Sequence, residues 1–97
     1  MTYQQRVRAW VVDCFGLTIA DDRAERSFRF LEEALELAQS VGATREQADR
    51  LVDYVYGRPV GQPAQEVGGV MVTMAALVSV IGIDMHAEAE RELERIS

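Results

Sequence analysis

The sequence predicts an all-α protein of about five helices. Apolar residues recur with the 3.6-residue period of a helix, and cap residues and glycines divide the chain into helix-sized segments. No stretch alternates with the period of two that is typical of a strand. The 97 residues, of which 48% are hydrophobic, are enough for one small packed domain, and we expect that domain to span residues 1–97.

The first two helices are predicted from apolar stripes. Residues 2–14 carry apolar side chains at positions i, i+3, i+4 and i+7, and Gly16 ends this helix. Thr18 is the expected N-cap of the second helix, which runs to about Val41, where Gly42 is placed to stop it. Its main apolar stripe consists of Phe28, Leu31, Leu35 and Ala38.

Local signals also define the last three helices. Thr44 and Gln47 form a capping box that opens a third helix, which ends near residues 56–57. A loop rich in proline and glycine follows, and Pro63 suits the first turn of a fourth helix over residues 63–81. Gly82 closes that helix, and Asp84 caps a fifth helix that starts at residue 85.

Residues 67–83 contain no charge. This stretch is at the lower limit of length for a membrane-spanning helix, and it is rich in small residues such as Gly68, Gly69, Thr73 and Ala76. We therefore expect a buried central helix that neighbours approach closely, and no membrane partner.

Charge and rare residues limit the classes of function. Sixteen acidic and ten basic residues give a net charge of −6, which argues against nucleic acid as a partner. The single cysteine, Cys14, cannot form an internal disulfide, so a cytoplasmic location is expected, with Cys14 as a small buried residue. The single histidine, His86, has no second histidine or cysteine with which to build a zinc site.

An acidic cluster in the second helix is the main chemical signal. Glu32, Glu33 and Glu36 lie within five residues, and like charges at this spacing weaken an isolated helix. Carboxylate oxygens suit Mg²⁺ or Mn²⁺, ions that often bridge to substrate phosphates. A solvated acidic helix face is the alternative interpretation. Glu66 adds a carboxylate at the start of the uncharged fourth helix, either as an ordinary first-turn glutamate or as an inward-facing ligand.

Three sequence segments in order resemble the MazG-type, all-α nucleoside triphosphate pyrophosphohydrolases. They are Glu-Glu-Ala-Leu-Glu at residues 32–36, Gln-Glu-Val-Gly-Gly-Val at 65–70 and Gly-Ile-Asp-Met at 82–85. In that superfamily an E-E-x-x-E helix precedes a helix with E-x-x-D, and G-I-D often introduces the last helix. The resemblance covers about residues 26–96, and it implies a MazG-like helical bundle that is completed by oligomerisation.

The resemblance also implies an activity and a site. Family members bind Mg²⁺ and hydrolyse a phosphoanhydride bond of a nucleoside triphosphate, which gives the monophosphate and pyrophosphate. The role that the family suggests is the removal of unwanted nucleotides. Carried over by position, the catalytic and metal-binding residues are Glu33, Glu36 and Glu66, with Glu32 as a further metal ligand. Mg²⁺ is the expected cofactor, with Mn²⁺ as a substitute, and the chain is expected to form a homodimer or homotetramer.

One position departs from the family pattern. Gly69 stands where the E-x-x-D motif has its aspartate, so one of four carboxylates is absent. Three alternatives follow for the missing aspartate. Asp53 or Asp49 on the third helix replaces it as a ligand, or the metal is held by three carboxylates and water. In the third alternative the chain has kept the fold and lost catalysis. The last case makes the chain a silent nucleotide-binding or helical interaction module. Arg58, in the loop before Pro59, is the candidate for contact with substrate phosphate.

Overall fold

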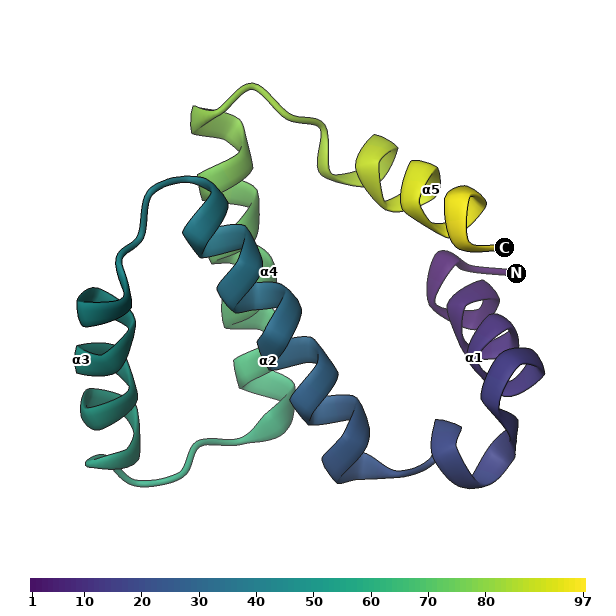
Figure 1. The fold of residues 1–97 in the computed structure, drawn as a ribbon, viewed down its shortest axis with the longest axis horizontal. Helices are drawn as coiled ribbons and strands as arrows, with labels where there is room; N and C mark the ends of the chain where they lie inside the picture. The colour runs from purple at the N-terminus through teal and green to yellow at the C-terminus, as the bar shows by residue number, and fades with distance from the viewer. The chain divides into compact units, whose positions relative to one another are not determined.

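The computed structural model describes residues 1–97 as five helices joined by short connections, with no strand (Figure 1). The all-α prediction is confirmed. The helices are α1 (Tyr3–Ala20), α2 (Arg23–Ser40), α3 (Arg45–Tyr56), α4 (Pro63–Val80) and α5 (Met85–Ile96). The chain divides into two units, one of residues 8–59 and one of residues 1–7 and 60–97.

The unit of residues 8–59 contains most of α1 and the α2–α3 hairpin. Gly16 has φ of 81° and ψ of 168°, so it kinks α1 and the chain makes one further turn to Ala20. Arg8 on α1 forms an ion pair with Asp21 at 2.6 Å, and the rings of Trp10 and Phe15 meet edge to face with centroids 5.8 Å apart. The Arg8–Asp21 ion pair spans the kink, whereas the Trp10–Phe15 contact lies within the part of α1 before Gly16.

The N-cap of α2 is Asp22, so the prediction of Thr18 is wrong. The Asp22 carboxylate accepts a hydrogen bond from the backbone N–H of Glu25 at 3.1 Å. A carboxylate at the cap also interacts favourably with the positive end of the helix. Thr18 instead lies within the last turn of α1.

The α2–α3 connection follows the predicted signals. Gly42 has φ of 103° and donates its N–H to the carbonyl of Gln39, while the N–H of Ala43 reaches the carbonyl of Ala38. This pair of bonds is a Schellman motif, which ends helices where glycine takes a positive φ. Thr44 and Gln47 then form both halves of the predicted capping box.

The unit of residues 1–7 and 60–97 contains the α4–α5 hairpin and the start of α1. Its connection has the same construction, because Gly82 takes φ of 71° and Ile83 donates its N–H to the carbonyl of Val78. Asp84 caps α5 by accepting from the N–H of Ala87 at 2.7 Å. Pro63 occupies the first turn of α4, as predicted.

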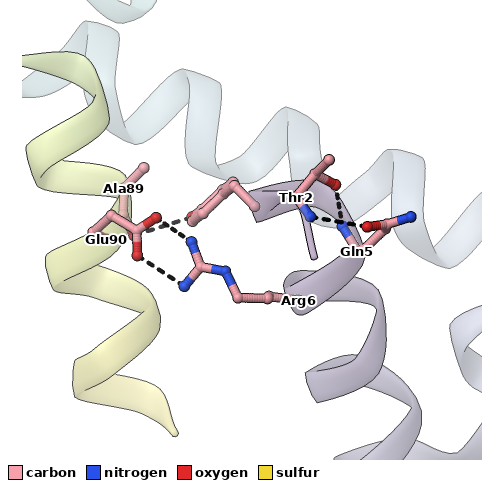
Figure 2. A network of polar contacts seen from close by, with 6 residues as sticks. Thr2, Gln5, Arg6, Ala89 and Glu90 are labelled. Carbon is pink, nitrogen blue, oxygen red and sulfur yellow. Dashed lines mark hydrogen bonds and ion pairs between the residues drawn. The ribbon is translucent and has the colours of Figure 1, made fainter.

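The two ends of the chain meet in this unit (Figure 2). The Arg6 guanidinium forms a two-pronged ion pair with Glu90, and the Tyr3 hydroxyl donates to the carbonyl of Ala89 at 3.1 Å. The Arg6 guanidinium also lies over the Tyr3 ring, 5.6 Å from its centroid. Thr2 and Gln5 cap α1 reciprocally, with each side chain accepting from the other's backbone N–H.

Little apolar surface is buried within one chain. Only Val11, Ala20, Val78 and Leu93 are buried, and no buried residue lies on α2 or α3. The expected buried central helix is not formed, since Val78 is the one buried residue of α4. Cys14 is exposed, which contradicts its predicted burial; the buried residues of α1 are Val11 and Ala20. By length and composition alone, with mean hydropathy 1.3, α4 is also apolar enough to cross a membrane.

Candidate functional site

The predicted site residues fall on both units. Glu32, Glu33 and Glu36 lie on α2 in the unit of residues 8–59, and Glu66 lies on α4 in the other unit. No group of three or more His, Cys, Asp or Glu side chains is gathered closely enough to hold a metal ion.

The arginines of α2 contact only part of the acidic cluster. Arg29 donates to Glu25 at 2.9 Å and lies 3.5 Å from Glu32. These carboxylates raise the pKa of Arg29, the hydrogen bond with Glu25 being the largest cause. Glu33 and Glu36 form no ion pair and are exposed to solvent. Two carboxylates, one helical turn apart, are therefore free to bind a cation.

Two acidic side chains of α2 border a groove in the α2–α3 hairpin. The groove has a volume of about 550 Å³, and Glu32, Glu36 and Asp49 are the acidic residues that line it. Its floor is apolar and includes Phe28, Leu31, Leu35, Ala38, Ala48 and Val52. Glu33 is not part of the lining, because it lies about 100° around the helix from Glu32.

Of the two candidate replacements for the motif aspartate, Asp49 and not Asp53 lines this groove. Asp49 lies 3.7 Å from Arg45 on the preceding turn and is largely exposed. Asp53 is exposed and forms no ion pair. The groove thus collects Glu32, Glu36 and Asp49, a set that the E-E-x-x-E pattern alone does not select.

Glu66 occupies the first turn of α4, and its side chain lies against Gly61. A Cβ atom at Gly61 would lie 3.1 Å from Glu66 Oε1, so the carboxylate folds back over the loop that precedes the helix. Gly69, one turn further on, has open space on its Cβ side, as does Gly68. A Cβ atom at position 69 therefore has no other atom within 4 Å of it.

Arg58, the predicted phosphate contact, is engaged with Tyr54. Its guanidinium donates to the Tyr54 hydroxyl at 3.0 Å and stacks on that ring, with Cζ 4.9 Å from the centroid. A cation over an aromatic face is a favourable local arrangement. The contact holds Arg58 at the end of α3, and the other guanidinium nitrogens keep donors for an anion.

Comparison with models of known protein families, with curated proteins and with solved structures gives no match.

Proposed function

We propose that the chain is a Mg²⁺-dependent nucleoside triphosphate pyrophosphohydrolase that releases the monophosphate and pyrophosphate. The observation that carries the proposal is the state of Glu33 and Glu36. They are exposed, one turn apart and without a cationic partner, on a helix whose Arg29 pairs with Glu25 and Glu32 instead. Unpaired carboxylates on one helix are the hard oxygen donors that Mg²⁺ or Mn²⁺ takes.

The donor chemistry fits such an ion, with water filling the remaining positions. In this proposal Glu33 and Glu36 would hold the metal, with Glu32 as the additional acidic ligand on α2. Glu66, which lies in the other unit, is a ligand by the motif resemblance alone. When bound, the ion neutralises phosphate oxygens and favours attack by water. One guanidinium N–H of Arg58 is donated to the Tyr54 hydroxyl, and in this proposal the remaining N–H groups bind the triphosphate.

The experiment that tests the proposal is pyrophosphate release from a panel of ribo- and deoxyribonucleoside triphosphates, with Mg²⁺ and with Mn²⁺. We expect metal-dependent release that is lost in Glu36→Gln, a variant that removes the charge and keeps the size. Release that persists unchanged in Glu36→Gln would assign the activity to another site or to a contaminant.

A matched pair of glycine variants tests the departure from the motif. Gly69→Asp restores the aspartate, and we expect it to raise the apparent Mg²⁺ affinity about tenfold, since it adds one ligand. Gly68→Asp is the control, because it adds the same charge at the neighbouring position, about 100° around the helix. Equal effects of the two variants would show that position 69 has no special relation to the metal.

A catalytically silent nucleotide-binding or helical interaction module is the second candidate, and Gly69 is the observation that favours it. This candidate predicts no pyrophosphate release from any nucleotide. It also predicts that Glu36→Gln leaves the melting temperature unchanged or raises it, because the substitution relieves repulsion on α2. A rise in melting temperature with Mg²⁺, in contrast, indicates a native-state metal site.

A further inference from the structure

One face of α2 carries two arginines followed by two glutamates. They stand at positions i, i+3, i+7 and i+10 of the helix and are Arg26, Arg29, Glu33 and Glu36. A helix turns by about 100° per residue, so Arg26 and Glu33 lie within about 20° of each other around the axis. Arg23, in contrast, lies about 80° away from Glu33. This arrangement follows from the geometry of α2 alone.

The two arginines of this face differ in how their charge is paired. Arg29 donates to Glu25 at 2.9 Å and lies 3.5 Å from Glu32. Arg26 lies 3.9 Å from the same Glu25 carboxylate, at the outer limit of an ion pair. The Nε atom of Arg26 is buried and donates to no acceptor, while the side chain as a whole is 34% exposed. A half-buried guanidinium with so distant a partner is stabilised when an anion reaches its outer nitrogens.

The spacing along the helix indicates which anion fits. A metal ion held by Glu33 and Glu36 binds oxygens of a phosphate chain. Seven residues of helix rise by about 10.5 Å, so Arg26 stands beyond the phosphates that touch the metal and on the same side of the helix. The guanidinium fork matches the oxygens of a phosphate group. A chain of several phosphates reaches both the metal and Arg26, whereas a single phosphate does not.

We propose that Arg26 is a substrate-binding residue that holds a phosphate of the triphosphate away from the metal. The proposal rests on the proposed function, because it needs the metal ion at Glu33 and Glu36. Arg58, the other phosphate contact, was selected by its place in a loop. Arg26 is selected by its position on the helix that carries the carboxylates and by its incomplete pairing.

Isothermal titration calorimetry of the full chain with inorganic tripolyphosphate, in the presence of Mg²⁺, tests the proposal. We expect Arg26→Gln to raise the Kd about tenfold, since a charged hydrogen-bonded contact is lost. Arg23→Gln is the matched control, because it removes the same charge from the same helix outside this face, and we expect a change of less than about twofold. Arg26→Lys keeps the charge without the fork and should raise the Kd by about threefold.

The melting temperature without ligand separates binding from a structural role. Arg26→Gln removes a buried N–H that has no acceptor, so we expect a melting temperature equal to or above that of the wild type. A lower melting temperature together with an unchanged Kd would assign Arg26 a structural role and overturn the proposal. If Arg26→Gln does not fold, Arg26→Lys decides, and an unchanged Kd in that variant overturns the proposal.

Pyrophosphate release distinguishes failure of this inference from failure of the proposed function. In an active wild type, we expect Arg26→Gln to raise the KM for nucleoside triphosphate about tenfold. If the wild type is active and Arg26→Gln behaves as Arg23→Gln does, the role of Arg26 is overturned and the proposed function stands. If the wild type releases no pyrophosphate, the proposed function fails and the tripolyphosphate titration still decides. A tenfold loss of binding in Arg26→Gln then supports Arg26 as the anion contact of a silent nucleotide-binding module, and no binding by the wild type overturns it.

Discussion

The two helical hairpins of this chain share one backbone plan and differ in side-chain chemistry. Each has an 18-residue helix, a glycine in a Schellman motif and a capped 12-residue helix. The first helix of the α2–α3 hairpin is charged along its length, while α4 is uncharged after Glu66. Backbone signals thus set where helices start and stop, and the side chains between them give each hairpin its own surface chemistry.

Burial also distinguishes the hairpins, and this difference gives the largest expected effect. Leu93 in the α4–α5 hairpin is 8% exposed, whereas Leu51 on α3 is 62% exposed. We expect Leu93→Ala to lower the free energy of unfolding by about 2–3 kcal/mol, and Leu51→Ala by less than about 0.5 kcal/mol. Chemical denaturation measures both values, and equal losses would contradict the burial assigned to Leu93.

The glycines of the two connections differ in backbone angle. Gly42 has φ of 103° and Gly82 has φ of 71°, which is nearer to the left-handed region that L-residues tolerate. No atom lies within 4 Å of a Cβ at either position, so strain alone sets the cost. We expect the free energy of unfolding to fall by about 2 kcal/mol in Gly42→Ala and by about 1 kcal/mol in Gly82→Ala, and thermal unfolding measures both values.

Gly68→Ala is the control for these two variants. Gly68 lies within α4 at a negative φ, and it also has open space on its Cβ side. The same chemical change should therefore stabilise the chain, by about 0.5–1 kcal/mol. A loss of stability at position 68 as well would mean that each glycine is needed for close packing rather than for its backbone angle.

The caps of α3 and α5 offer a finer comparison. Thr44 takes part in a reciprocal box with Gln47, whereas Asp84 caps alone because the methyl group of Ala87 cannot accept a hydrogen bond. Replacing either cap residue by alanine should lower the free energy of unfolding by about 1 kcal/mol, which chemical denaturation measures. Gln47→Ala should cost a few tenths of a kcal/mol. If Gln47→Ala is neutral, the box adds nothing to the Thr44 cap.

The smallest effect concerns acid sensitivity of the α4–α5 unit. The hydrogen bond from Arg6 lowers the pKa of Glu90 below its ordinary value of 4.5. A carboxylate with a lowered folded-state pKa contributes stability above its ordinary pKa and loses it as pH falls through the folded value. Unfolding midpoints measured between pH 7 and about pH 3 should therefore converge for the wild type and Glu90→Gln at the acid end. A constant difference between them would contradict the assigned ion pair.

Helix boundaries were predictable because their signals are local. Each signal depends on a few neighbouring residues. Five predicted boundaries are confirmed: helices begin at Thr44, Pro63 and Asp84, and helices end at Gly42 and Gly82. The prediction of Thr18 as the N-cap was wrong because the helix begins after Asp22, four residues later. The Asp22 carboxylate accepts a hydrogen bond from the N–H of Glu25, the third residue of that helix. Thr18 and Asp22 are both cap-forming residue types, so residue type alone does not show which of them begins the helix.

Burial and the candidate site depend on contacts that local rules do not describe. The apolar stripe of Phe28, Leu31 and Leu35 predicted an apolar face correctly, yet it does not say what covers that face. Similarly, the acidic pattern selected Glu33 and Glu36, whereas the presence of Asp49 on the same groove as Glu36 depends on how α3 turns back along α2. Spacing within one helix carries no information about that turn.

The joining of the two chain ends bears on the order of events during synthesis. Arg6 and Tyr3 find their partners at Glu90 and Ala89, more than eighty positions later, so their unit stays incomplete until residues 89 and 90 have left the ribosome. The α2–α3 hairpin contains all of its own caps and emerges well before that point. The nascent chain therefore exposes the α2–α3 groove before residues 85–96 have been synthesised.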